Sequence, residues 1–157
     1  MNNWSIKIIQ QILILVISII ASNCDLNKNN SNSIMSTYGS IDSHRAGEDC
    51  MECHKSGGDA GIVFSIAGTI YHTNSNIVFS NTSVTLFDDI DVNNIPLEIF
   101  EVDGKGNFYS NIPIDWQNGL FVSVSIANQV KRMNGTIFDG SCNHCHGVDI
   151  PYINIEQ

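Results

Sequence analysis

The sequence predicts an all-β protein built as an antiparallel β-sandwich of about seven strands. Two segments, Ser83–Phe87 and Leu120–Ile126, show the period-two alternation of half-buried strands. Clusters of Asn, Asp, Ser and Gly recur between the apolar segments, as expected for turns. No window of about 11–18 residues sustains the i, i+3, i+4 spacing of an amphipathic helix. Short strands separated by regular turn signals favour a sandwich.

The first strand is expected within Ile62–Tyr71, which is rich in β-branched and aromatic residues. The other strand candidates, in chain order, are Ile77–Ser80, Ser83–Phe87, Leu97–Val102, Asn107–Ser110, Leu120–Ile126 and Val130–Phe138. The predicted turns between them include Thr73–Asn76, Asp88–Asn94 and Asp103–Gly106.

Two copies of Cys-x-x-Cys-His flank this body, at Cys50–His54 and Cys142–His146. In an exported protein this spacing is typical of covalent c-type haem attachment. Two thiols at this spacing can each add to a vinyl group on one porphyrin edge, and the adjacent His can bind the iron. The sequence therefore predicts two covalently attached haem c groups. The attachment residues would be Cys50, Cys53, Cys142 and Cys145.

A second interpretation of the motifs stays open. The chain has 5 Cys, and the fifth, Cys24, lies outside both motifs, so no further pair remains for a structural disulfide. Each motif could instead close a short disulfide, or the four thiols could share one zinc ion, with or without the motif histidines.

The axial ligands of the iron follow from position. His54 and His146 are the expected proximal ligands because each directly follows its second Cys. His44 and His72 are the candidate sixth ligands: His44 lies shortly before Cys50, and His72 closes the first strand, where a loop begins.

Two further side chains, His144 and Met133, enter the choice of ligand. His144 lies between the two Cys of its motif, so it can reach only the other haem, and only if the two motifs pack together. Met133 is an alternative sixth ligand that would raise the reduction potential. Seven antiparallel strands between the motifs predict haems at opposite poles of a sandwich roughly 20 Å tall, whereas an even number would bring them together.

Residues 1–23 predict a signal peptide of the lipoprotein type. The apolar run from Ile12 to Ala21 is shorter than the roughly 20 residues of a membrane span. The residues before Cys24 resemble a bacterial lipoprotein cleavage box, in which this Cys becomes the lipidated first residue, although Asn23 replaces the usual Gly or Ala. We expect an exported protein, lipid-anchored to a bacterial membrane and facing the periplasm or the cell surface. Simple cleavage and secretion is the alternative.

The rest of the chain divides by composition. Residues 24–40 are rich in Asn and Ser and predict a flexible tether, with an extended arm packed on the domain as the alternative. Residues 41–150 form the predicted domain with its two flanking motifs, and residues 151–157 form a C-terminal tail. The net charge of −9 argues against nucleic-acid binding and suits a redox partner with a basic docking surface.

Three stretches resemble the carboxypeptidase-regulatory-like domain, a transthyretin-type β-sandwich. They are Ile66–Tyr71, Val84–Asp88 and Val102–Tyr109, the last with the pattern Asp-x-x-Gly-x-Phe. The resemblance covers residues 62–127 and implies a fold. Such a sandwich between two Cys-x-x-Cys-His motifs is similar to exported cytochrome-like lipoproteins of bacteria, which implies haem but no particular reaction.

Together these observations predict a membrane-tethered dihaem protein that carries electrons and is not an enzyme. No nucleophile–base pattern such as Gly-x-Ser-x-Gly occurs in the sequence. A peroxidase is an alternative that needs one five-coordinate iron. The alternative of another class is a surface or periplasmic β-sandwich binding module whose motifs hold zinc or disulfides.

Overall fold

The structure, a computed structural model, describes residues 33–73, 75–89 and 95–156. The described chain is all-β, as predicted, and its two helical segments are single turns within the cysteine motifs. The predicted signal peptide, Cys24 and residues 24–32 of the predicted tether lie outside the described residues. Within the described ranges no helix is long and apolar enough to cross a membrane.

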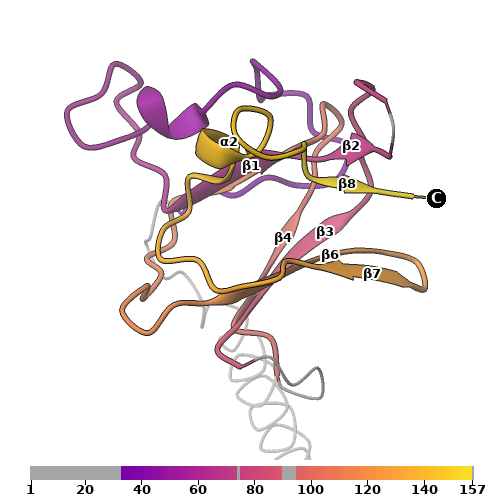
Figure 1. Ribbon diagram of the computed structural model, residues 1–157. Helices are drawn as coiled ribbons and strands as arrows, with labels where there is room; N and C mark the ends of the chain where they lie inside the picture. The colour runs from indigo at the N-terminus through magenta and orange to yellow at the C-terminus, as the bar shows by residue number, and fades with distance from the viewer. Residues whose placement is uncertain (1–32, 74, 90–94, 157) are drawn as a thin grey trace, which may run out of the picture. The chain divides into compact units, whose positions relative to one another are not determined.

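A four-stranded antiparallel sheet forms one layer, with strand order β4-β3-β6-β7 (Figure 1). Its strands are β3 (Ser83–Phe87), β4 (Glu98–Glu101), β6 (Phe121–Ile126) and β7 (Gln129–Arg132). Strand β3 is central and pairs with β4 on one side and with β6 on the other. The predicted segment Val130–Phe138 is strand only at its start, since β7 ends at Arg132 ahead of the turn-forming Asn134 and Gly135.

Two short two-stranded sheets, called ribbons below, lie over this sheet in Figure 1. In the first ribbon, β1 (Ile66–Thr69) pairs antiparallel with β5 (Asn107–Ser110). In the second, β2 (Tyr71–His72) pairs parallel with β8 (Asn154–Ile155). Strand β8 lies in the predicted C-terminal tail, which is therefore part of the sheet structure. The predicted strand Ile77–Ser80 forms one isolated bridge, between Val78 and Tyr71.

The hydrophobic core joins the four-stranded sheet to the ribbons. Phe100 on β4 and Phe108 on β5 are its largest fully buried side chains. The other members come from both layers: Ile66, Ile70, Phe79, Val84, Leu86, Val102, Leu120, Val124 and Ile155. Burial of apolar surface from both layers holds β1 in place. Both cysteine motifs pack against β1, as described below.

The prediction of haem sites at opposite poles is wrong: the two motifs lie side by side. The chain does not run directly from β7 to the second motif. It first returns along the sheet, where Ile137 bridges Leu120, and then crosses to the other layer, where Ser141 pairs in parallel with Ala67 of β1. This return segment adds one change of chain direction that the predicted count of seven strands did not include.

The segment before the first motif packs on the domain. Met35 bridges Ser110, and the buried Ser36 receives a hydrogen bond from the backbone N–H of Tyr109 at 3.0 Å. The Ser36 hydroxyl donates to the carbonyl oxygen of Glu101 at 2.6 Å, so it joins β5 to β4. Residues 33–40 thus form the packed arm that the sequence left as the alternative to a tether.

We expect Ser36→Ala to destabilise the protein by about 1–3 kcal/mol, because it leaves the Tyr109 N–H without this acceptor in a buried position. Urea unfolding measures the effect, and Thr37→Ala is the control because Thr37 is exposed. Equal stabilities of the two variants would contradict a packed arm.

Candidate functional site

The first motif is a single 3-10 turn followed by a loop. The 3-10 helix η2 (Cys50–Glu52) begins after Asp49, whose side chain accepts a hydrogen bond from the Met51 N–H at 3.0 Å. This contact is an N-terminal cap that satisfies a free backbone donor. The backbone N–H of His54 then donates to the carbonyl oxygen of Cys50 at 3.0 Å. The thiols of Cys50 and Cys53 are free and half-buried.

The second motif is the short helix α2 (Cys142–Cys145), which packs against β1. Here too the N–H of the motif histidine, His146, donates to the carbonyl oxygen of the first Cys at 3.0 Å. As whole residues Cys142 is half-buried and Cys145 is exposed, and both thiols are free. The two motifs therefore share the same local fold although their surroundings differ.

Both motif histidines are held by the same kind of contact. The Nδ1 atom of His54 lies 3.1 Å from the carbonyl oxygen of Ile62, and Nδ1 of His146 lies 2.8 Å from that of Pro151. A carbonyl oxygen can only accept, so Nδ1 must carry the proton in each ring. In the neutral imidazole this leaves Nε2 with a lone pair. Such a contact orients the ring and fixes the tautomer in metal-binding histidines.

The carboxylate of Asp49 joins the two motifs. Besides capping η2, its Oδ1 accepts a hydrogen bond from the Ser141 hydroxyl at 2.7 Å, just before α2. Its Oδ2 lies 3.3 Å from Nδ1 of His144, which is on α2. The His144 ring is mostly exposed, whereas the Asp49 side chain is only 16% exposed. Because the carboxylate is largely removed from water, its hydrogen bonds are worth more than those of a surface pair.

A buried polar network forms a second link between the motifs. Asn143, between the two Cys of the second motif, is buried, and its Oδ1 accepts from the Thr69 N–H at 2.9 Å. The Thr69 hydroxyl donates to Oδ1 of Asn107 at 2.7 Å and accepts from the Gly47 N–H at 2.8 Å. The amide of Asn107 donates to the Ser43 hydroxyl at 2.9 Å. The end of β1 is thus bonded to α2 and to the segment ahead of Cys50.

The close approach of α2 to β1 depends on Gly68. A Cβ atom at this position would lie 2.9 Å from Cβ of Cys142 and 2.7 Å from the ring of Phe108. Both distances are shorter than real contacts allow. The absence of a side chain at Gly68 therefore allows Cys142 to pack closely against β1.

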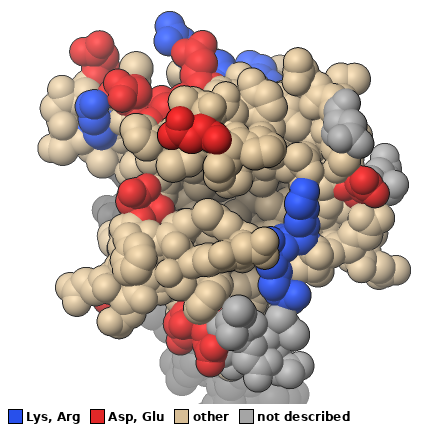
Figure 2. All heavy atoms as spheres, in the orientation of Figure 1, with Lys and Arg blue, Asp and Glu red and all other residues tan. Residues whose placement is uncertain are grey.

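A cleft of about 470 Å³ opens between α2 and the four-stranded sheet. Figure 2 shows this hollow in the centre of the molecule, with basic side chains beside it. Cys142, Cys145 and His146 all line it, together with Lys131, Met133 and Asn154. The remaining walls are largely apolar and are formed by residues such as Val84, Phe108, Val122, Val124, Ile137, Phe138, Ile150, Pro151, Tyr152 and Ile153. The volume lies in the range of roughly 300–1,000 Å³ that is usual for ligand and cofactor sites.

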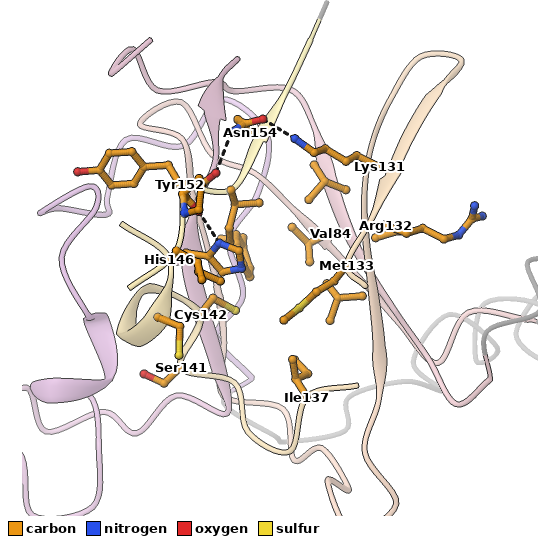
Figure 3. Close-up of a pocket in the computed structure, with 18 of the residues that line it drawn as sticks. Val84, Lys131, Arg132, Met133, Ile137, Ser141, Cys142, His146, Tyr152 and Asn154 are labelled. Carbon is orange, nitrogen blue, oxygen red and sulfur yellow. Dashed lines mark hydrogen bonds between the residues drawn. The ribbon is translucent and has the colours of Figure 1, made fainter. Parts of the chain in front are cut away.

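The side chains of the cleft have distinct directions in Figure 3. Met133 extends from the β7 side toward the wall that carries Cys142 and His146. Lys131 reaches across one end and bonds Oδ1 of Asn154, whereas Arg132 points away. Lys131 thus gives one end of the largely apolar cleft a positive charge, and the acidic Asp139 also lines the cleft.

The first thiol of each motif is held in its neutral form. Burial, and then the carboxylate of Asp49, raise the pKa of Cys50 from 9.0 to about 11. Burial, followed by Asp139, Cys50 and Asp49, raises the pKa of Cys142 from 9.0 to about 12. That the Cys50 thiol contributes to the shift of Cys142 reflects how close the two motifs are.

The candidate sixth ligands lie in different places. The ring of His44 has its centre 6.0 Å from that of His54, at an interplanar angle of 36°. The ring of His72 packs against Phe79 with centres 3.9 Å apart. The two motifs pack together, which is the condition under which His144 could reach the haem of the other motif. The His144 ring contacts Asp49.

No group of three or more His, Cys, Asp and Glu side chains that could hold a metal ion forms among the described residues. Searches for a matching family model, for a similar curated protein and for a similar solved structure found no match. The resemblance to the carboxypeptidase-regulatory-like domain stays a prediction.

Sequence reasoning missed the residues that bring the motifs together. Asp49, Gly68, Thr69, Ser141 and Asn143 carry no signal of their own, because each matters only through a partner far away in the chain. The Cys-x-x-Cys-His spacing identified the motifs themselves, and their role as haem sites stays a prediction.

We expect Asn143→Ala to lower the stability of the haem-free protein by about 1–3 kcal/mol, because the buried N–H of Thr69 loses its acceptor. Asn134→Ala is the matched control, since it makes the same substitution at an exposed position outside the network. Denaturant unfolding measures both variants. An Asn143→Ala variant no less stable than Asn134→Ala would contradict the polar network.

We expect Cys142 in the folded, haem-free protein to react far more slowly with iodoacetamide than the exposed Cys145. A pKa of about 12 instead of 9.0 lowers the thiolate fraction near neutral pH by about a thousandfold, and only the thiolate reacts. The alkylation rate of Cys142 should therefore keep rising as the pH increases above 9.0, the ordinary pKa of a thiol, toward about 12. Peptide mass mapping after timed alkylation measures it, and in urea the difference between the two thiols should vanish. Equal rates in the folded protein would contradict a buried Cys142.

Proposed function

We propose that this protein is a dihaem c-type electron carrier, tethered by lipid to a bacterial membrane and facing the periplasm or the cell surface. Cys50 and Cys53 would hold one haem and Cys142 and Cys145 the other, with His54 and His146 as proximal ligands. When bound, haem supplies a metal that changes valence by one electron. The polypeptide supplies attachment, orientation and access.

One observation carries the proposal: each motif histidine has its Nδ1 fixed on a backbone carbonyl, at 3.1 Å for His54 and 2.8 Å for His146. Two short disulfides would place no such demand on the rings. The contact leaves Nε2 of each ring available as a ligand, and the same pattern recurs at both motifs although their partner residues differ.

The cleft beside the second motif suits haem in its chemistry. Its apolar walls would cover a flat, hydrophobic macrocycle, and both Cys and the His of the motif line it. Lys131 at one end offers a positive charge to the carboxylates of the haem. Beside the first motif, the ring of Phe64 stacks on His54 with centres 4.0 Å apart and would keep the imidazole in one orientation.

The adjacency of the motifs supports electron carriage. Asp49 and Ser141 hold the two attachment segments against each other, so two cofactors would lie close together in one chain. Around the first motif the exposed carboxylates Asp42, Glu48, Glu52 and Asp59 outnumber the cations Arg45 and Lys55, which pair with Glu48 and Glu52. This excess of negative charge suits a redox partner with a basic docking surface.

We expect the protein, produced in a bacterial periplasm with haem-attachment machinery, to carry two haems that survive denaturation. Intact mass and a pyridine haemochrome spectrum measure the number. The double variant Cys50→Ser with Cys53→Ser should keep one haem, as should Cys142→Ser with Cys145→Ser, because each thiol pair serves one group. The matched control, Cys24→Ser, should keep both haems.

A protein that gains no haem, and instead holds zinc or disulfides at the motifs, would contradict the proposal. It would then favour the surface or periplasmic binding module.

A further inference from the structure

The two motifs offer different side chains to the open face of a bound iron. The motif histidines share one kind of contact, from Nδ1 to a backbone carbonyl oxygen. The side chains that lie near His54 and near His146 differ.

At the first motif a second imidazole stands at a suitable distance. The ring centres of His44 and His54 are 6.0 Å apart. Two imidazoles on opposite sides of one metal have centres roughly 6 Å apart, since each metal–nitrogen bond is about 2.0 Å and Nε2 lies about 1 Å from the ring centre.

The backbone around His44 is anchored. The side-chain amide of Asn107 donates to the His44 carbonyl oxygen at 3.4 Å and to the Ser43 hydroxyl at 2.9 Å. Lys105 donates to the Ser43 carbonyl oxygen at 2.6 Å. Because Asn107 is buried, the main chain of an exposed residue is held by the core of the domain. An imidazole on an anchored backbone loses less entropy when it binds a metal.

At the second motif the opposite wall carries a thioether. Among the described residues that line the cleft, His146 is the only imidazole and Met133 the only thioether. The N–H of Met133 donates to the Val122 carbonyl oxygen at 3.0 Å, which fixes its backbone to β6. Its side chain points across the cleft toward the wall of Cys142 and His146 (Figure 3).

We propose that the two sites have different sixth ligands, His44 at the first motif and Met133 at the second. His72 is then not a ligand: it is not among the described residues that line the cleft, and its ring packs on Phe79. This inference rests on the proposed function. A Met ligand raises the reduction potential relative to a second His. With Met133 as its ligand, the second site would have the higher potential, so an electron would pass favourably from the first site to the second.

The test compares four variants of the dihaem protein with the unchanged one. Met133→Leu removes the thioether and keeps the volume, and Met35→Leu is its control because the exposures match, 39% for Met133 and 38% for Met35. His44→Ala removes the imidazole, and His72→Ala is its control. Haem content by mass, the absorption and paramagnetic resonance spectra of the ferric protein, and a potentiometric titration are recorded for each.

We expect the unchanged protein to show two distinct potentials and the long-wavelength charge-transfer band of a Met–Fe(III) bond. Met133→Leu should lose that band and lower the higher potential, with both haems still attached. His44→Ala should keep the band and convert one haem to a high-spin spectrum, which free imidazole should return to low spin. The two controls should match the unchanged protein.

Two results would overturn the inference while leaving two attached haems and the proposed function intact. One is a Met–iron band that is absent from the unchanged protein or persists in Met133→Leu. The other is a His44→Ala spectrum that stays low-spin, or a change in His72→Ala. An unchanged protein without haem overturns the proposed function itself, and this inference with it.

Discussion

The architecture of the site depends on the carboxylate of Asp49. It is bonded to Met51 beside it in the chain and to Ser141, 92 residues away. A largely buried carboxylate must have its lone pairs satisfied, and here the donors come from both cysteine motifs. Without this contact, η2 would lose its cap and α2 would lose one of its two links to the first motif and the segment before it, the other being the network through Asn143 and Thr69. Satisfying one acidic group thus helps to hold the two cysteine motifs together.

Strand β1 gives this pair of motifs a rigid support. Its apolar side chain Ile66 is fully buried in the core, Gly68 admits Cys142, and Thr69 bonds the buried Asn143. Sites on strands are held more precisely than sites on loops. The cleft follows from the same arrangement, because α2 is raised above the four-stranded sheet by the ribbon that it packs on. A cofactor bound there would have one wall from the motif and the other from β6 and β7.

The sequence allowed prediction of the elements that depend on local pattern. The bounds of β3 and β5 match the predicted segments, because alternation and flanking turns define them. The spacing of Cys and His defined the two motifs, and their role as haem sites stays a prediction. The spatial relation of the motifs was predicted wrongly, since the return along Leu120 and the crossing to Ala67 are set by tertiary packing. For the same reason strand β8 was missed and the packed arm around Ser36 was only an alternative: each is ordered by a distant partner, Tyr71 and Tyr109 respectively.

The most direct test of this account is a double-mutant cycle between Asp49 and Ser141 in the haem-free protein. The free energy of unfolding is measured for Asp49→Ala, for Ser141→Ala and for the double variant. A hydrogen bond between the motifs predicts a coupling energy of about 0.5–3 kcal/mol. Effects that add to within about 0.5 kcal/mol would show that Asp49 and Ser141 do not interact, and would contradict the link through Asp49 that this account places between the two motifs.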